Sequence, residues 1–263
     1  MSQNSVPHTF RAFGITDPGR KRALNEDSFE VDEELGLLLV ADGMGGHKSG
    51  EVASQLATKE IYQFIREQSR ASTHSYSAPP QTEDETVIVP PDAFDIVLNA
   101  THKACKTINE VNHQRGHPDG SGMGCTVSGI WYSSEKQRTI VFNVGDSRVY
   151  KVQDGEITQL TRDHTAYQEW LDNGELGPEP RKNIIIRALG PWPQIAVDTQ
   201  VDIPSPGDLY LACSDGLWGM LDDESIKKTI DAGNDLADIC ATLVDQANEN
   251  GGRDNITVVL GRV

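Results

Sequence analysis

The sequence has no apolar run that approaches the roughly 18 residues that a membrane-spanning helix requires. Its first residues, Met1 to Phe13, also have no apolar stretch of the length typical of a signal peptide. No C-x-x-C pair occurs among the four scattered cysteines, Cys105, Cys125, Cys213 and Cys240, so neither a zinc site nor a disulfide framework is predicted. We therefore expect a cytoplasmic protein that makes no membrane contact and whose thiols are buried and reduced.

Positive charge is also scarce. The 263 residues include 23 Lys and Arg against 40 Asp and Glu, a formal net charge of -17. This charge argues against nucleic acid as a partner, whose phosphates would be repelled, and against anionic membrane surfaces. A phosphorylated substrate would be repelled too, unless local cations reversed the field. Bound divalent metals and Arg22 are the candidates for that reversal.

Hydrophobic residues make up 37% of the chain, which is ample for the core of one large domain or two small ones. Their periodicity predicts strands and helices in separate blocks. Strands are expected over 9–15, 28–41, 126–132, 139–143, 148–152, 184–188, 209–213 and 256–261, and helices over 49–68, 94–111, 164–173, 223–230 and 235–248. The strands between 126 and 152 are expected to form one antiparallel meander. Segregated blocks favour an α+β layered fold over a doubly wound one.

One long segment, Ser69 to Pro91, is dominated by Ser, Thr, Pro and acidic residues. This composition predicts a mobile loop that joins two helices. The loop contains no interpretable motif, so a low-complexity connection is favoured over a site that recruits a partner.

Acidic residues recur beside glycine, asparagine or another acid. The stretches are Asn25-Glu26-Asp27, Ala41-Asp42-Gly43-Met44-Gly45-Gly46, Val144-Gly145-Asp146-Ser147-Arg148, Cys213-Ser214-Asp215-Gly216 and Arg253-Asp254-Asn255. Three of them follow apolar runs that predict buried strands, which would carry the carboxylates to strand ends. Carboxylates gathered within a few ångströms cannot all stay ionised without cations among them. A single Asp-Gly pair would be an ordinary turn, but the recurrence predicts a site for a hard cation such as magnesium or manganese.

Eight motifs stand in one order along the chain. They are Arg22-Ala23-Leu24-Asn25-Glu26-Asp27, Val40-Ala41-Asp42-Gly43-Met44-Gly45-Gly46-His47, Gly124-Cys125-Thr126, Val144-Gly145-Asp146-Ser147-Arg148-Val149-Tyr150, Thr161-Arg162-Asp163-His164, Arg187-Ala188-Leu189-Gly190, Ser214-Asp215-Gly216-Leu217-Trp218 and Asp254-Asn255-Ile256-Thr257. In these motifs the chain resembles, nearly end to end, the metal-dependent Ser/Thr protein phosphatases of the type 2C (PPM) family, particularly the short bacterial single-domain members.

The resemblance implies one domain over residues 1–263. Its fold would be a central β-sandwich of two antiparallel sheets flanked by helix pairs, in four α-β-β-α layers. Two or three divalent cations, manganese or magnesium, would lie at one end of the sandwich. Asp42 would bridge the first two metals, and Asp215 and Asp254 would be ligands of the first. Asp146 would help Asp215 to hold a weaker third metal.

By the same resemblance, the second metal would be bound by the carbonyl of Gly43 and, through water, by Glu26. Asp27 is expected in the outer shell. The catalytic residues would be Asp42 and Arg22, with Arg22 binding the substrate phosphate through its planar fork. Without the motif, Arg22 would be interpreted as a solvated residue in the basic run 20–22. A water or hydroxide shared by two metals would attack the phosphoester in line, and no phosphoenzyme is needed.

Two features depart from the family pattern. Met44 stands after Asp42-Gly43, where many eukaryotic members have a proposed general-acid histidine. His47 on the same loop is a possible replacement, although a loop-surface histidine is the favoured interpretation. The flap segment 164–187 is shorter than usual, which predicts a more rigid or more open flap. Trp170 and Trp218 are expected to pack in the core rather than to bind peptide.

The resemblance implies a phosphatase that hydrolyses phosphoserine and phosphothreonine in proteins and opposes a cytosolic Ser/Thr kinase. We expect it to be a monomer. Two alternatives stand beside it: a catalytically silent phosphoprotein-binding module of the same fold, and a hydrolase of small phosphoesters. The presence of Asp42, Asp215 and Asp254 together argues against the silent module.

Overall fold

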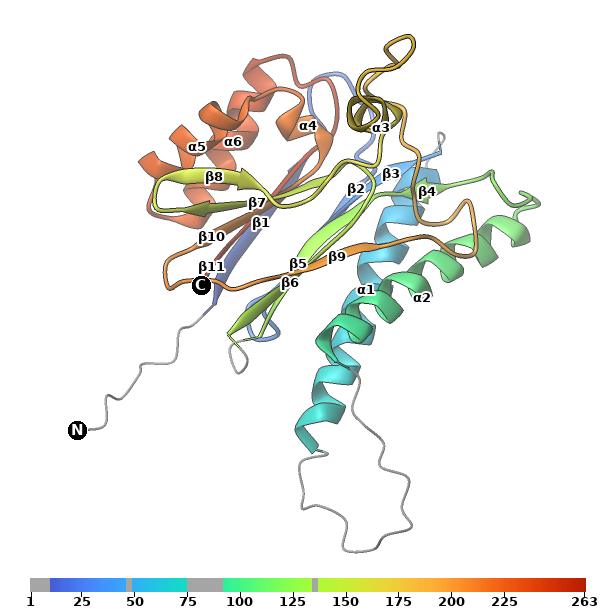
Figure 1. The fold of residues 1–263 in the computed structure, drawn as a ribbon, viewed down its shortest axis with the longest axis horizontal. Coiled ribbons are helices and arrows are strands. Elements are labelled where there is room, and N and C mark those ends of the chain that lie inside the picture. The colour runs from blue at the N-terminus through green and yellow to red at the C-terminus, as the bar shows by residue number, and fades with distance from the viewer. Residues whose placement is uncertain (1–9, 46–48, 75–91, 134–136) are drawn as a thin grey trace, which may run out of the picture.

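The computed structural model describes residues 10–45, 49–74, 92–133 and 137–263. Two antiparallel sheets are stacked face to face, and helices cover both outer faces (Figure 1). The first sheet has the order β1 (Arg11–Asp17), β11 (Ile256–Arg262), β10 (Leu209–Cys213), β7 (Arg148–Gln153) and β8 (Glu156–Gln159). The second has the order β2 (Asp27–Asp32), β3 (Leu37–Met44), β5 (Val127–Ser133), β6 (Arg138–Val144) and β9 (Asp198–Asp202), and β4 (Gly124–Cys125) pairs with the end of β3.

Each sheet carries its own helices. α1 (Ser49–His74) and α2 (Ala93–Gln114) pack on the second sheet, whereas α4 (Asp215–Trp218), α5 (Asp223–Ala232) and α6 (Leu236–Glu249) pack on the first (Figure 1). α3 (Ala166–Asp172) lies near one end of the sandwich. The predicted α+β sandwich of four α-β-β-α layers is confirmed.

Strand β3 shows why the strands could be recognised in the sequence. Leu37 and Leu39 face the helices α1 and α2, while Leu38 and Val40 face the first sheet. Both faces of the strand are therefore covered, so both sets of alternating side chains must be apolar. This burial explains the continuous run that predicted the strand.

The helices begin and end largely as predicted. α1 buries Ala53, Ala57, Ile61 and Ile65 along one face, but it continues to His74, past Ser69, where the loop was expected to start. Residues 75–91 lie outside the described part of the chain. α5 and α6 are capped by Asp222 and Asp235, whose carboxylates accept hydrogen bonds from backbone N–H groups of the first turn.

The strand prediction was wrong in several details, and the short strands β4 and β8 were not predicted. β6 pairs with β5 and β9, whereas β7 pairs with β10 and β8, so the expected meander changes sheets between Val144 and Arg148. Residues 184–188 form no strand, because only one isolated bridge, between Thr165 and Ile185, involves them. β9 was missed because its residues are mostly polar, which is typical of an exposed edge strand.

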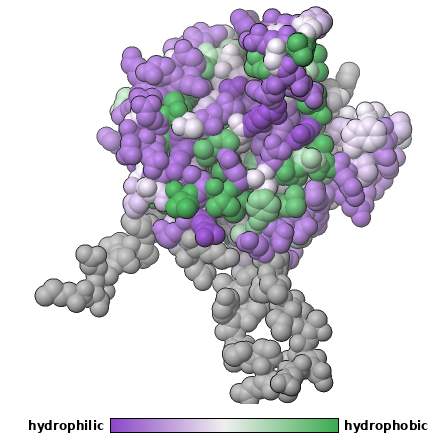
Figure 2. Space-filling view, viewed as in Figure 1, coloured by the Kyte–Doolittle hydropathy of each residue, from purple (hydrophilic) through white to green (hydrophobic). Residues whose placement is uncertain are grey.

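Most of the face in Figure 2 is hydrophilic, and apolar side chains gather in a band across its lower half. The exposed large apolar side chains include Val201 and Ile203, in and just after the edge strand β9. All four cysteines are buried and unpaired, as predicted. Among the described helices, none combines the length and the apolar character needed to cross a bilayer.

Candidate active site

Five aspartates lie where strands begin or end near one end of the sandwich. Asp27 begins β2 and pairs directly with Asp42 near the end of β3. Asp215 follows β10 as the first residue of α4, and Asp254 lies just before β11. Asp146 lies at the crossing between β6 and β7. The fold therefore brings together carboxylates from all five acidic stretches, although the stretches are far apart in the sequence.

Burial and mutual repulsion raise the pKa values of these groups. Burial raises the pKa of Asp27 to about 7, and the charges of Asp215 and Asp254 act in the same direction. Burial raises the pKa of Asp215 to about 6, helped by Asp254. The pKa of Asp42 is raised well above its ordinary value by burial and then by the charges of Asp27, Asp215, Asp146 and Asp254. Four carboxylates thus act on Asp42 at once, which makes it the electrostatic centre of the cluster.

Three carboxylate oxygens in the cluster are buried without a hydrogen-bond partner among the described residues: Oδ1 of Asp27, of Asp146 and of Asp215. A buried oxygen of this kind is costly unless a donor or a cation satisfies it. Carboxylate oxygens are the ligands that magnesium and manganese prefer. The donor set therefore fits divalent cations. In the described part of the chain, no three acidic, His or Cys side chains already converge as around a bound ion.

Arg22 lies at the exposed edge of this cluster, beside Asp254. Its Nη2 donates a hydrogen bond to Oδ2 of Asp254 at 2.6 Å, and its side chain keeps 52% of its surface exposed. Partial burial lowers the pKa of Arg22, but the carboxylates of Asp254, Asp215 and Asp42 outweigh this effect and raise it. Arg22 is therefore part of the acidic site and is not simply a member of a solvated basic run.

Gly43 and Glu26 meet through their backbones beside Asp42. The Gly43 N–H donates to the Glu26 carbonyl at 3.1 Å, and the Gly50 N–H donates to Glu26 Oε1 at 3.2 Å. A Cβ at Gly43 would lie 2.2 Å from the Gly50 carbonyl oxygen and 2.5 Å from that of Glu26. Only glycine fits this contact, because both clashing atoms belong to the backbone.

Gly43→Ala is expected to destabilise the protein, because β3 and the start of α1 must move apart to admit the methyl group. Overpacking of this kind costs about 1–3 kcal/mol, which lowers the melting temperature by roughly 3–10 °C in a domain of this size. Thermal unfolding followed by circular dichroism measures the change. A variant that melts with the wild type would contradict the close backbone contact.

The residues that hold the aspartates were not predicted from the sequence. Ser214 Oγ and Thr257 Oγ1 donate to Asp27 Oδ2 at 2.7 and 2.6 Å. Asn255 accepts a hydrogen bond from the Glu26 N–H at 2.8 Å and donates to the Leu24 carbonyl at 2.8 Å, which fixes the loop after Arg22 against β11. The holding residues Ser214, Asn255 and Thr257 lie inside the quoted motifs, but nothing in the sequence indicated which segments they would contact.

The other candidates have mixed outcomes. Met44 ends β3 and has no titratable group, and His47 lies outside the described residues. Trp218 packs against the core of the first sheet, as predicted. Trp170 lies within the flap instead, where it contacts Tyr167 and donates to the Gly177 carbonyl at 3.2 Å.

Known proteins are similar to this chain over almost its whole length. The family model described as Protein phosphatase 2C matches residues 19–260. The serine/threonine phosphatase stp of Listeria monocytogenes is 35% identical over 259 residues, which cover 93% of this chain and 92% of the relative.

Two solved structures share the four-layer fold. The crystal structure of the serine/threonine phosphatase PstP/Ppp of Mycobacterium tuberculosis has a TM-score of 0.80 and 31% identity, covering 97% of this chain and 98% of that one. The catalytic domain of PstP in complex with two manganese ions has a TM-score of 0.78 and 31% identity, with 96% and 97% covered. The chain belongs to the protein phosphatase 2C family, among its bacterial serine/threonine phosphatases, and the resemblance seen in the eight motifs is confirmed.

Proposed function

We propose that the protein is a metal-dependent serine/threonine protein phosphatase that hydrolyses phosphoserine and phosphothreonine in proteins. The observation that carries this proposal is the cluster of buried, mutually repelling carboxylates around Asp42, with Arg22 at its exposed edge. The relatives named above are serine/threonine phosphatases, and one was solved with two manganese ions. Neither the structure nor the relatives favour the catalytically silent alternative.

We assign two or three manganese or magnesium ions to the acidic cluster. Asp42 would bridge two of them, and Asp215 and Asp254 would be ligands of the first. The Gly43 carbonyl and, through water, Glu26 would hold the second, which accords with the contact between their backbones. Asp27 would remain in the outer shell, with Oδ2 held by Ser214 and Thr257 and Oδ1, which has no partner among the described residues, free to accept a hydrogen bond from a metal-bound water.

Asp146 and Asp215 would hold a further, weaker cation. Each has a buried Oδ1 without a hydrogen-bond partner among the described residues. The charge of Asp215 also contributes to raising the pKa of Asp146, after burial. A cation between these two oxygens would remove both costs.

Divalent cations bound here would lower the pKa of a water molecule and offset charge on the phosphoryl oxygens. The protein's part is to position the substrate. Arg22 pairs with Asp254 in this structure, and a cation on Asp254 would weaken that pair and release the guanidinium. Its planar fork would then bind two phosphate oxygens and place the phosphoryl group over Asp42.

The setting of this activity is part of the proposal. We place the protein in the cytoplasm as a monomer with one type 2C domain over residues 1–263, which includes a flap at about 164–187. A cognate Ser/Thr kinase would supply its phosphorylated substrates. We propose no nucleic-acid or membrane partner, because the net charge of -17 would repel both phosphate backbones and anionic lipids.

The direct test is phosphate release from a phosphothreonine peptide with manganese, with magnesium and with a chelator, beside a small aryl phosphate. The proposal predicts metal-dependent release that the chelator abolishes, with the peptide preferred. Equal or better turnover of the aryl phosphate would favour the small-phosphoester hydrolase. No release from folded, metal-loaded protein would favour the binding module.

Arg22→Ala is expected to lower kcat/KM for the phosphopeptide about 10- to 100-fold. Hydrogen bonds to charged groups contribute about 1.5–3 kcal/mol, and each 1.36 kcal/mol corresponds to about a tenfold change in rate. Arg22→Lys is expected to fall between the variant and the wild type, because an ammonium group cannot bind two oxygens through a fork. Steady-state kinetics measure the effect.

Arg20→Ala is the matched control, since Arg20 is exposed in the same basic run. It should retain the activity of the wild type. An equal loss in both variants would mean that the basic run acts only by its general charge, against the role assigned to Arg22.

A further inference from the structure

The turn that carries Asp146 is held by residues to which the proposed chemistry gives no role. Asp146 is 2% exposed and lies where the chain crosses from one sheet to the other. Gly145 before it has φ +108, and a Cβ there would lie 2.5 Å from Thr126 Cγ2. The contacts that hold this turn therefore decide where the Asp146 carboxylate lies.

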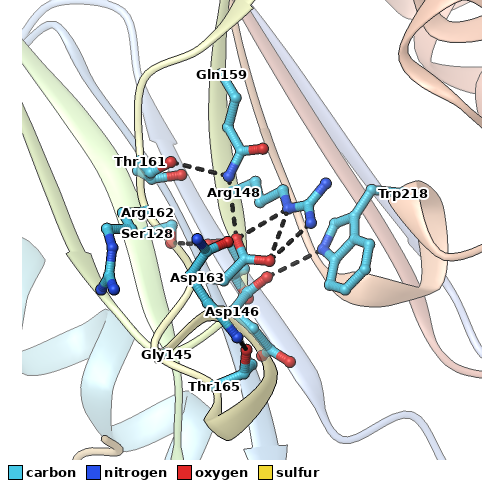
Figure 3. Close-up of polar contacts among 12 residues, drawn as sticks. Ser128, Gly145, Asp146, Arg148, Gln159, Thr161, Arg162, Asp163, Thr165 and Trp218 are labelled. Carbon is cyan, nitrogen blue, oxygen red and sulfur yellow. Dashed lines mark hydrogen bonds and ion pairs between the residues drawn. The ribbon is translucent and has the colours of Figure 1, made fainter. Parts of the chain in front are cut away.

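Trp218 links this turn to Asp215. Its indole Nε1 donates a hydrogen bond to the Asp146 carbonyl oxygen at 3.0 Å (Figure 3). Trp218 is the last residue of α4, and Asp215 is the first. One helical turn therefore carries one of the two carboxylates and contacts the backbone of the other. The bond therefore ties α4, which carries Asp215, to the turn that carries Asp146.

The indole is itself held by an ion pair. The Arg148 guanidinium carbon lies 3.8 Å from the centre of the Trp218 ring. Arg148 donates from Nε and Nη2 to the two Asp163 carboxylate oxygens, at 2.9 and 2.7 Å for the shorter contacts. Gln159 Nε2 donates to the same carboxylate at 3.0 Å. Figure 3 shows Arg148 between Asp163 on one side and Trp218 on the other. The ring therefore has little freedom to turn away from Asp146.

The residue after Asp163 holds the other side of the turn. The His164 N–H donates to the Gly145 carbonyl at 2.8 Å, and the Gly145 N–H donates to His164 Nδ1 at 3.1 Å. His164 thus contacts the residue before Asp146, and Asp163 contacts Arg148, two residues after it. The turn is fixed from the flap side and from α4 together.

The ion pair does not take the place of a cation at Asp146. Arg148 is paired with Asp163, whose Oδ2 lies 2.7 Å from its Nη2, so its positive charge is already offset. Oδ1 of Asp146 also keeps no hydrogen-bond partner among the described residues. Trp218, Arg148 and Asp163 therefore position the Asp146 carboxylate without neutralising it, so that it can still bind a cation.

We infer that Trp218 is a positioning residue for the weaker cation, and that its indole N–H, steadied by Arg148 and Asp163, determines the affinity of the pair Asp146 and Asp215 for that ion. The inference rests on the proposed function, which assigns a cation to these two carboxylates. It predicts that Trp218, which is not itself a metal ligand, controls the affinity of one cation site and leaves the affinities of the other two sites unchanged.

The test is manganese binding by metal-free protein, followed by isothermal titration calorimetry and by electron paramagnetic resonance of free manganese. Trp218→Phe keeps an aromatic ring for Arg148 but removes the N–H donor. Loss of an outer contact weakens metal binding about 10- to 100-fold, and we expect about tenfold for the weakest site alone. Trp170→Phe, the same change at a tryptophan in the flap, should bind manganese like the wild type.

Two further variants keep the test decisive. Arg148→Lys retains the charge but loses the planar contact with the ring and should also weaken only the weakest site. Asp146→Asn should remove that site. Wild-type affinities in Trp218→Phe, or an equal weakening of every site, would overturn the inference, and so would an Asp146→Asn protein that binds the full number of ions. The proposed function is tested separately, by phosphate release from the wild-type protein, and that result does not depend on these variants.

Discussion

Asp42→Ala is expected to lower kcat/KM for a phosphothreonine peptide at least about a thousandfold. Asp42 lies opposite Asp27 in the sheet and is affected by the charges of four other carboxylates, and we propose that two cations share it as a ligand. Metal ions stabilise charge in the transition state by several kcal/mol, and about 4 kcal/mol corresponds to about a thousandfold in rate. Steady-state kinetics at saturating manganese measure the loss.

Glu156→Ala is the matched control for that variant. Glu156 is an exposed acid at the start of β8, on the hairpin at the far end of β7 from Asp146. It should keep wild-type activity, and both variants should unfold cooperatively. An Asp42→Ala protein that is folded and retains more than about a tenth of the activity would show that the shared ligand lies elsewhere.

The metal-free protein is expected to become less stable as the pH rises from about 5 to 7.5. The pKa values of Asp27 and Asp146 are raised to about 7, and that of Asp215 to about 6, from an ordinary value of 3.8. Between these limits the folded state holds protons that the unfolded chain releases. The stabilisation is therefore complete below about pH 4 and is lost as the pH passes through 6 and 7.

The size of this effect follows from the shifts. Each pKa unit corresponds to about 1.4 kcal/mol, so together these buried groups account for several kcal/mol, or on the order of 10 °C in melting temperature. Manganese at about 100 times its dissociation constant should restore about 2.7 kcal/mol per site at neutral pH. His164 acts in the opposite direction, since burial lowers its pKa, but it is one group against four aspartates whose pKa values are raised, Asp42 included.

Calorimetric melts of metal-free protein at several pH values, with and without manganese, measure this profile. Asp146→Asn should flatten it, because one titrating carboxyl group is gone. A melting temperature of the metal-free protein that stays level or rises between pH 5 and 7.5 would contradict the electrostatic account of the cluster.

The sequence predicted elements well where burial leaves a plain pattern. The residues of β3 are apolar on both faces because helices cover one and the other sheet covers the second. Where the pattern is weak, the prediction was wrong: β9 is a polar edge strand, and Ile184 and Ile186 are exposed apolar residues outside any strand. The change of sheet between β6 and β7 could not be predicted, because alternation shows that a strand exists but not which strand it pairs with.

Some residues of the site could likewise be predicted from the sequence, and others could not. The acidic stretches could be found because acids recur beside glycine, asparagine or another acid and because three of the five stretches follow apolar runs. The family resemblance supplied the proposed roles. The residues that hold the acids act across long separations in sequence: Ser214 reaches Asp27 over 187 residues, and Trp218 reaches Asp146 over 72. Such contacts depend on the packing of the two sheets, which no local spacing reports.

The central claim is that the five aspartates form one centre that binds divalent cations and that hydrolysis occurs there. The most direct measurement is anomalous diffraction at the manganese edge from crystals grown with manganese. The account predicts two strong peaks that both contact Asp42, the first also contacting Asp215 and Asp254, and a weaker one between Asp146 and Asp215. Manganese bound away from Asp42, or no peak beside ordered carboxylates, would contradict it.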